Sequence, residues 1–326
     1  WMVRKAAVDS LERKRMVYTA NSGMMDLRKE ICNYIQRKYQ ITYHSEHETL
    51  VTVGGSEAID LAIRAVVNPG DEVLVVEPSF VCYKPIVELM HGVAVPISTK
   101  LENRFKLTAE ELRSHITERT KLLILPYPNN PTGGIMTRKD LEAIAEVLRD
   151  TNILVLTDEI YSELTYGRKH VSIASIDGMW ERTIYVSGFS KAFAMTGWRL
   201  GYVCAPEPIA KQMLKIHQYA IMSAPTLSQY AAIVALRECD KDVQKMVEEY
   251  NVRRRMLVDG FNRIGLTCFN PEGAFYMFPC IRSTGMSSEE FCEKLLQEEK
   301  VAVVPGNAFG DSGEGFVRVS YAYSLK

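Results

Sequence analysis

The sequence predicts an α/β protein, with a large domain built on a mostly parallel sheet covered by helices and a smaller C-terminal α+β domain. Short apolar, β-branched runs alternate with helical patterns through the centre of the chain. Repeated β-α units with near-continuous apolar strands build parallel sheets that are covered on both faces. After Pro206 the pattern changes to long helices followed by a short mixed segment. The 326 residues, 47% of them hydrophobic, are enough to bury a large core.

The first β-α unit shows the pattern that the others repeat. Leu50–Val53 is predicted as a strand, Ser56–Val67 as a helix with one apolar face, and residues 68–71 as a turn. The later elements of the large domain are predicted, in order, at Val73–Val76, Val93–Ile97, Leu122–Leu125, the helix Arg138–Arg149, Ile153–Thr157, Ile184–Val186 and Tyr202–Ala205.

The C-terminal part is predicted to contain longer helices and fewer strands. The helices are expected at Ile209–Tyr219, Leu227–Glu238, Val243–Ile264 and Ser288–Glu299. Strands are expected at Thr267–Phe269, Ala274–Phe278, Val301–Val304 and Phe316–Val319. We therefore expect a large domain at residues 1–250 and a small domain at residues 251–326. The chain begins inside a predicted helix, Val3–Glu12, and ends just after a predicted strand, so we expect both ends to be trimmed.

Composition excludes several classes of protein. A net charge of −1 gives no electrostatic footprint for nucleic acid or an anionic membrane. No apolar run approaches the roughly 18 residues of a membrane span, and the first residues do not resemble a signal peptide. The seven cysteines form no C-x-x-C pair, which indicates a reducing, cytoplasmic location. His44 and His47 share a polar loop, and we expect no metal site.

Residues 187–201 carry the strongest chemical signal. Lys191 lies among small residues directly after an apolar run, and Arg199 follows eight residues later between glycines. Lysine can form a Schiff base with a carbonyl cofactor. Small neighbours leave room for a ring, and an arginine can bind a phosphate through a fixed fork of donors.

Polar residues also follow other predicted strands. Asp158 closes the run 153–157, where ligands of open α/β sheets bind; an aspartate there is equally typical of a helix N-cap. Residues 54–57 (Gly-Gly-Ser-Glu) join a strand to a helix and could bind an anion, although a glycine turn before a helix explains them equally well. Residues 128–133 (Pro-Asn-Asn-Pro-Thr-Gly) are by composition a turn.

Residues 187–201 resemble the lysine-attachment signature of the class I/II aminotransferases, which are enzymes of fold type I that use pyridoxal 5′-phosphate (PLP). The resemblance runs from Tyr18 to Arg318, and the matching pieces occur in the family's order. It implies that Lys191 forms the internal Schiff base and then moves the substrate proton, with its pKa lowered by nearby cationic groups. Asp158 is implied to hold the pyridine nitrogen protonated. Tyr161 and Asn130 are implied to donate to the ring 3′-oxygen.

The resemblance assigns the other site residues as well. Backbone N–H groups of Gly55, Ser56 and Glu57 are expected to bind the cofactor phosphate. Ser190 and Arg199 are expected to add side-chain contacts, with Ser190 replacing a serine that the family often has at the position of Gly188.

Three aromatic residues and an arginine complete the assignment. Phe80 is expected to stack on the ring, and Tyr83 to lie near Asp158. Tyr18 is expected to reach the phosphate of the neighbouring subunit, so that a homodimer shares its active sites. Arg318, with Asn130, is expected to bind the substrate α-carboxylate.

The resemblance implies an aminotransferase that moves an amino group between an L-amino acid and a 2-oxo acid by way of pyridoxamine phosphate. We expect a broad or an aromatic or aspartate-type amino donor, with 2-oxoglutarate as the acceptor. Two alternatives stay open at this stage. One is a PLP-dependent C–S β-lyase, although its asparagine loop usually departs from the Pro-Thr-Gly present here. The other is the aminotransferase-like effector domain of a transcription regulator.

Overall fold

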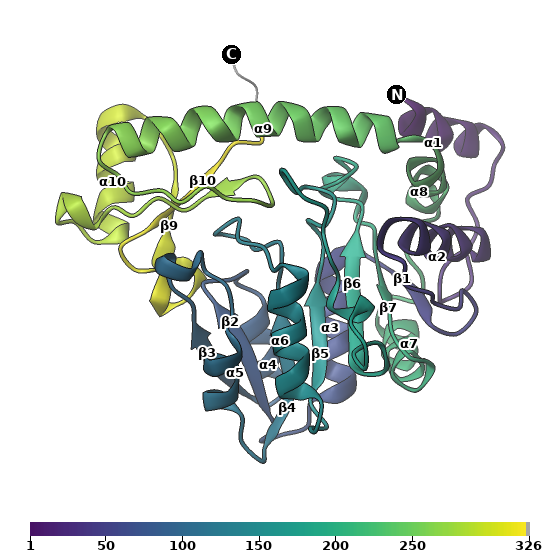
Figure 1. Ribbon diagram of the computed structural model, residues 1–326. Coiled ribbons are helices and arrows are strands. Elements are labelled where there is room, and N and C mark those ends of the chain that lie inside the picture. Colours follow the sequence, from purple (N-terminus) through teal and green to yellow (C-terminus); the bar gives the residue numbers. More distant parts are fainter. Residues whose placement is uncertain (324–326) are drawn as a thin grey trace.

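A seven-stranded sheet forms the centre of the computed structural model, which describes residues 1–323 (Figure 1). The strand order is β1-β7-β6-β5-β4-β2-β3. Strands β2 to β6 pair in parallel, and only β7 runs antiparallel to both of its neighbours. The strands are β1 (Thr49–Thr52), β2 (Glu72–Glu77), β3 (Val93–Ser98), β4 (Thr120–Leu125), β5 (Leu154–Asp158), β6 (Thr183–Gly188) and β7 (Gly201–Cys204). The predicted mostly parallel sheet is thus confirmed.

Helices cover both faces of this sheet because its strands are apolar on both sides. Along β4, Leu122 and Ile124 join the core cluster of α3 and α7, whereas Leu123 and Leu125 join the cluster of α5 and α6. That alternation is the two-residue period of a strand. The helices of this part are α1 (Met2–Glu12), α2 (Met25–Tyr39), α3 (Gly54–Val66), α4 (Tyr83–Leu89), α5 (Ala109–His115), α6 (Arg138–Leu148), α7 (Glu207–Ala220) and α8 (Thr226–Glu238).

The C-terminal part is connected through α9 (Asp240–Arg263), which extends from the neighbourhood of α1 to that of α10 (Ser288–Glu299) along the top of Figure 1. A second, antiparallel sheet has the order β8-β10-β9. Its strands are β8 (Tyr276–Met277), β9 (Val304–Pro305) and β10 (Val317–Ser320). The expected domain boundary at residues 250/251 falls inside α9 and stays a prediction. Single 3₁₀ turns are η1 (Leu101–Asn103), η2 (Ile173–Ser175), η3 (Trp180–Arg182), η4 (Thr196–Trp198), η5 (Arg282–Thr284), η6 (Gly306–Phe309) and η7 (Asp311–Gly313).

Three predicted C-terminal strands differ in the structure, and of Val301–Val304 only Val304 belongs to a strand, β9. Residues 267–269 form no strand, because the backbone N–H of Cys268 donates to the side chain of Asn262 at the end of α9 (3.1 Å). The predicted strand Ala274–Phe278 is shortened to β8, since Ala274 has a φ of 56° and donates to Leu164 O (2.9 Å). A left-handed residue cannot continue a pleated strand.

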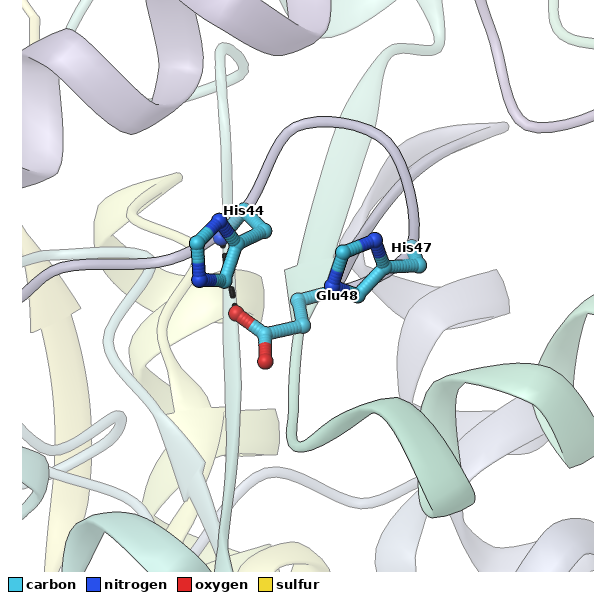
Figure 2. Close-up of side chains that lie close together, drawn as sticks. All are labelled: His44, His47 and Glu48. Atoms are coloured by element: carbon cyan, nitrogen blue, oxygen red, sulfur yellow. Dashed lines mark hydrogen bonds between the residues drawn. The ribbon is translucent and has the colours of Figure 1, made fainter.

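The loop before β1 brings together His44, His47 and Glu48, whose potential ligand atoms lie within 4.8 Å of one another (Figure 2). Glu48 Oε2 already accepts the backbone N–H of His44 at 2.7 Å, and the two imidazole rings stack 5.0 Å apart. His47 also pairs with Glu207 at the start of α7 (3.8 Å). These contacts close the loop and tie it to the start of α7.

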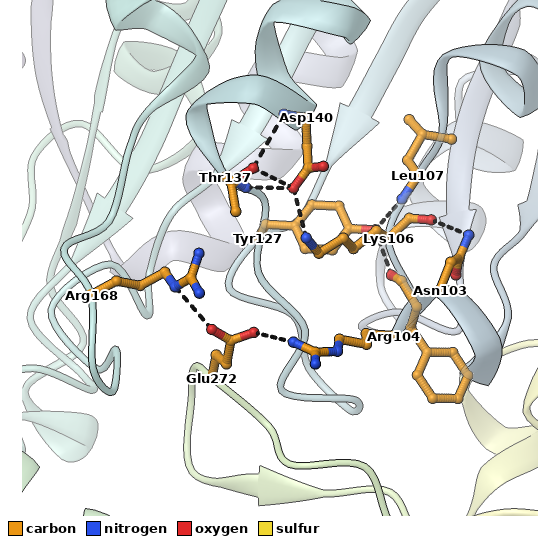
Figure 3. Close-up of polar contacts among 10 residues, drawn as sticks. Asn103, Arg104, Lys106, Leu107, Tyr127, Thr137, Asp140, Arg168 and Glu272 are labelled. Atoms are coloured by element: carbon orange, nitrogen blue, oxygen red, sulfur yellow. Dashed lines mark hydrogen bonds and ion pairs between the residues drawn. The ribbon is translucent and has the colours of Figure 1, made fainter.

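The turn at residues 271–274 joins the C-terminal part to the large sheet (Figure 3). Glu272 pairs with Arg104 at 3.0 Å and with Arg168 at 2.9 Å. The backbone N–H groups of Glu272 and Gly273 both donate to Gly133 O (3.1 and 2.9 Å). Strand β8 therefore begins next to the loop that contains Asn130. Within residues 1–323, no helix has the length and apolar character needed to cross a membrane.

Candidate active site

A cavity of about 250 Å³ opens where the carboxyl ends of the central strands meet the C-terminal part. The first turn of α3, the ends of β5 and β6, and β10 all contribute to its wall. Most of the sequence-predicted site residues line it, namely Gly55, Ser56, Phe80, Asn130, Asp158, Tyr161, Ser190, Lys191, Arg199 and Arg318. The structure thus brings together residues that are spread from position 55 to position 318.

Lys191 lies in the loop after β6, with Nζ 5.7 Å from the ring centre of Tyr161 and 5.6 Å from that of Phe275. Its pKa is lowered chiefly by burial, with further lowering by Arg318 and Arg199, while Asp158 opposes the shift. The direction agrees with the prediction, but desolvation, rather than the neighbouring cations, is the largest cause. A lowered pKa raises the fraction of free amine that can act as a nucleophile.

Asp158 is the last residue of β5 and is 7% exposed. Tyr83 donates to one carboxylate oxygen (2.7 Å), and the backbone N–H of Ile160 donates to the other (3.2 Å). Burial raises the pKa of the Asp158 carboxyl, and these two hydrogen bonds oppose that rise. A cationic group placed in the cavity would favour the charged carboxylate further, because opposite charges attract strongly in a buried site.

Arg318, on β10, lines the cavity from the C-terminal part of the chain. Its Nη1 donates to Asn130 Oδ1 at 3.0 Å, and its guanidinium lies 4.6 Å from the ring centre of Tyr276 and 4.9 Å from that of Phe309. The buried Nε finds no hydrogen-bond partner among residues 1–323. A buried donor without an acceptor is costly, so this guanidinium is suited to binding an anion such as a carboxylate.

Tyr161 points its hydroxyl toward that of Tyr276 at 3.0 Å. Burial raises the pKa of the Tyr161 hydroxyl well above its usual range, and the neighbouring Tyr276 adds to the shift. Tyr161 is therefore held as a neutral hydrogen-bond donor.

The first turn of α3 offers backbone N–H groups that have no acceptor within the helix, and the side chain of its N-cap residue, Val53, makes no capping hydrogen bond. Gly55 and Ser56, in this turn, line the cavity. Arg199 closes over the turn so tightly that a Cβ on Gly54 would lie 2.6 Å from Arg199 Nη2. A helix N-terminus beside a guanidinium is suited to binding an anion.

Gly188, which stands where the resembling family often has serine, is explained by packing. A Cβ at this position would lie 2.9 Å from Gly201 Cα and 3.1 Å from Ile160 Cδ1. Gly201 is its partner in the β6–β7 register, and a Cβ on Gly201 would in turn lie 2.5 Å from the backbone carbon of Gly54. A serine would force these strands apart, and Ser190 is the hydroxyl that lines the cavity instead.

Two predicted residues lie outside the cavity lining. The Glu57 carboxylate turns away from it and contacts His217 and the backbone N–H of Val53. Tyr18 is 85% exposed. For Glu57 the predicted contact is made by the backbone N–H and not by the side chain. For Tyr18 the predicted contact is with the phosphate of a second subunit. Both therefore stay predictions.

Tyr276, Ile160 and Thr196 also line the cavity but were not singled out from the sequence. Tyr276 lies in a segment predicted as a strand, and alternation along a strand does not tell which face meets a site in another part of the fold. Its only signal was its place between two phenylalanines, at 275 and 278.

The three cations of the cavity are Lys191, Arg199 and Arg318. Within residues 1–323, none of them forms an ion pair with a carboxylate. Lys191 and Arg318 are partly buried and Arg199 is exposed, so these three cations are free to bind a ligand that carries negative charge. Asp158 between them is suited to a cationic group.

The chain is similar to known proteins over its whole length. The family model described as aminotransferase class I and II matches residues 2–325. The YugH protein of Bacillus subtilis (strain 168) is 50% identical over 326 residues, which cover 100% of this chain and 84% of that protein. An aspartate aminotransferase of Pyrococcus abyssi is 44% identical over 323 residues, covering 98% of this chain and 83% of the relative.

The fold of the chain is also similar to that of a solved aminotransferase structure. The aromatic aminotransferase from Pyrococcus horikoshii OT3 superimposes with a TM-score of 0.97 at 42% identity, covering 99% of this chain and 87% of that chain. The match therefore includes both the large sheet and the C-terminal part.

Proposed function

Since the chain belongs to the class I and II aminotransferase family and is a transaminase, we propose that its cofactor is pyridoxal 5′-phosphate and that Lys191 holds it. The prediction of fold type I is confirmed by the solved neighbours. The same matches do not favour the two alternatives, a C–S β-lyase and the effector domain of a transcription regulator.

The observation that supports the cofactor is the charge pattern of the cavity. Arg199, which has no carboxylate partner within residues 1–323, lies beside the first turn of α3, the buried carboxylate of Asp158 lies in the wall, and the amine of Lys191 has a lowered pKa. These groups match a phosphate, a pyridine nitrogen and an aldehyde carbon, respectively. When bound, the cofactor supplies that carbonyl carbon and a ring that accepts electrons from the substrate.

The residues of the chain then have separate tasks. Asp158, held by Tyr83 and Ile160, keeps a proton on the ring nitrogen. Lys191 Nζ would take the proton from the substrate Cα and deliver it to the former aldehyde carbon of the cofactor, C4′. Tyr161 and Asn130 would orient the ring through its 3′-oxygen, and Phe80 would stack on its face.

The phosphate is assigned to the first turn of α3. Backbone N–H groups of Gly55, Ser56 and Glu57 would donate to it, and Ser190 and Arg199 would add side-chain donors. Three of these groups come from one helix end, which makes the site favourable for a doubly charged anion.

Arg318 would bind the substrate α-carboxylate, with Asn130 beside it. The aromatic rings of Tyr276 and Phe309 lie next to the guanidinium of Arg318. Relatives at 44% and 42% identity are named aspartate aminotransferase and aromatic-amino-acid aminotransferase. We propose aspartate or an aromatic amino acid as the amino donor and 2-oxoglutarate as the acceptor.

A homodimer with shared active sites accounts best for Tyr18, which is exposed and lies outside the cavity of its own chain. The seven cysteines are all unpaired, which supports a reducing, cytoplasmic location. Mixing inactive Lys191→Ala and Tyr18→Ala proteins tests the sharing. A mixed dimer regains one intact site if Tyr18 acts across the interface, and regains none if it does not.

Half-reaction spectra test the proposed function as a whole. The cofactor-loaded protein is mixed with each amino acid in the absence of an oxo acid, and its absorbance is followed. We expect aspartate, phenylalanine or tyrosine to convert the cofactor to its amine form. Addition of 2-oxoglutarate should reverse the conversion. A protein that binds no cofactor, or that is converted by none of these amino acids, would contradict the proposal.

A further inference from the structure

Behind the first turn of α3, a buried histidine of α7 contacts the side chain of Glu57. The side chain of His217 is fully buried, and its Nδ1 lies 2.6 Å from Glu57 Oε1. The other oxygen, Oε2, accepts the backbone N–H of Val53, the residue that precedes α3. The Glu57 carboxylate thus links α7 to the turn at which α3 begins.

This link lies directly behind the groups assigned to the cofactor phosphate. Gly55 and Ser56 of the same turn face the cavity. Donors bind an anion best when their positions are fixed before the anion arrives. A carboxylate anchored at both oxygens holds the start of the turn in place.

The contact with His217 also keeps the Glu57 carboxylate away from the cavity. A carboxylate and a phosphate repel each other, and a released Glu57 side chain could turn toward the same free N–H groups that the phosphate needs. His217 donates from α7, and so directs the carboxylate to the far side of the turn.

The second nitrogen of His217 decides which tautomer is present. Nε2 is buried and has no hydrogen-bond partner within residues 1–323. A proton there would be a buried donor without an acceptor, which is costly. The geometry therefore favours a proton on Nδ1, which His217 donates to Glu57 Oε1.

We propose that His217 is a positioning residue for cofactor binding, which fixes the phosphate-binding turn of α3 through Glu57. The inference rests on the proposed function, because it requires that the phosphate binds at this turn. The proposed role concerns the phosphate alone. Loss of His217 should therefore weaken the binding of PLP and leave the binding of an analogue without phosphate unchanged.

The test compares PLP with pyridoxal, which lacks the phosphate, on the cofactor-free full chain. For His217→Leu we expect the Kd for PLP to rise about tenfold, a difference within the range of one hydrogen bond to a charged group. The Kd for pyridoxal should stay unchanged. His217→Asn, whose amide can donate from near the Nδ1 position, should restore most of the PLP affinity.

Met213→Ala is the matched control, since Met213 is another fully buried residue of α7 and its apolar side chain offers Glu57 no hydrogen bond. It should lower thermal stability without a phosphate-specific effect. If His217→Leu does not fold, Glu57→Gln removes one of the two carboxylate acceptors and should give the same pattern.

Two outcomes would overturn the inference. In the first, His217→Leu and Glu57→Gln bind PLP as the wild type does. In the second, they weaken PLP and pyridoxal equally, which indicates a general structural role. A wild-type protein that binds no PLP would instead overturn the proposed function itself.

Discussion

The two walls of the cavity are built differently. One wall consists of residues at the ends of β5 and β6, such as Asp158 and the loop with Lys191, inside a seven-stranded sheet. The other consists of Tyr276 and Arg318, which come from strands of two and four residues. That wall is joined to the large sheet partly through Glu272, whose partners Arg104 and Arg168 are 60% and 48% exposed.

This difference indicates that the strand-end wall governs the chemical step and that the C-terminal wall governs substrate binding. Backbone pairing places Asp158 opposite Val186 in the β5–β6 register, so the strand-end wall is rigid and suits groups that carry out chemistry. The C-terminal wall is joined to the large sheet by a few backbone hydrogen bonds to Gly133 and by the ion pairs of Glu272, which water and salt weaken, and it suits a group that binds different substrates. Changes in the first wall should therefore lower kcat, and changes in the second should raise KM or alter stability.

Lys191→Ala should have the largest effect. The loss of the amine removes both cofactor attachment and proton transfer, so we expect turnover to fall by about a thousandfold or more. Steady-state assays with aspartate and 2-oxoglutarate measure the loss. Lys191→Arg keeps the charge but offers no free amine, and should be equally inactive; an active Lys191→Arg protein would show that only the charge matters.

Asp158→Asn should rank second. Without a carboxylate, the ring nitrogen loses the partner that keeps it protonated, and kcat should fall by about a hundredfold to a thousandfold. Tyr83→Phe, which removes one hydrogen bond to the same carboxylate, should cost less. Equal effects of the two substitutions would contradict the role given to Asp158.

Arg318→Lys tests the C-terminal wall. A lysine keeps the charge but loses the forked geometry for a carboxylate, so we expect KM for the amino acid to rise about ten- to a hundredfold, with a smaller change in kcat. Steady-state kinetics with saturating cofactor separates the two constants. A change in kcat alone would mean that this wall takes part in the chemistry.

The pH dependence of cofactor capture connects the two walls. Only deprotonated Lys191 captures the cofactor, so the capture rate should rise with pH through a midpoint below 10.5, because burial and Arg318 lower the pKa. Arg318→Gln removes one cause of the lowering and should move the midpoint to higher pH. The measurement is the rate of PLP uptake by the cofactor-free protein against pH, and an unchanged midpoint would exclude coupling between Arg318 and Lys191.

Glu272→Gln should have the smallest effect. Ion pairs with exposed arginines contribute about 1 kcal/mol or less each, so the midpoint of thermal unfolding should fall by only a few degrees. High salt should reduce the difference from the wild type, because it screens the same pairs. A large loss of stability, insensitive to salt, would show that the junction is held more firmly than its exposure indicates.

Much of the strand-end wall could be predicted from the sequence. Buried parallel strands are nearly continuous apolar runs, so the polar residue that closes a run, such as Asp158, marks the edge where ligands bind. Lys191 and Arg199 were recognisable from their small neighbours and spacing. The resemblance to a family supplied the roles that spacing alone could not.

Contacts between distant residues could not be predicted in this way. The close approach of Gly188 to Gly201, and the pairing of Glu57 with His217, join segments whose sequence patterns are independent of each other. The left-handed Ala274, which shortens β8, has no signature because alanine is normal in a strand or helix. Tertiary packing, rather than local propensity, decided all three.

Reductive trapping of the cofactor-loaded protein tests the central claim most directly. Borohydride fixes pyridoxal 5′-phosphate to the lysine that holds it, and peptide mapping by mass spectrometry then locates the pyridoxyl group. The account predicts one modified lysine, Lys191, with no label in the Lys191→Ala protein. Stable labelling of a different lysine, or no labelling of the wild type, would contradict it.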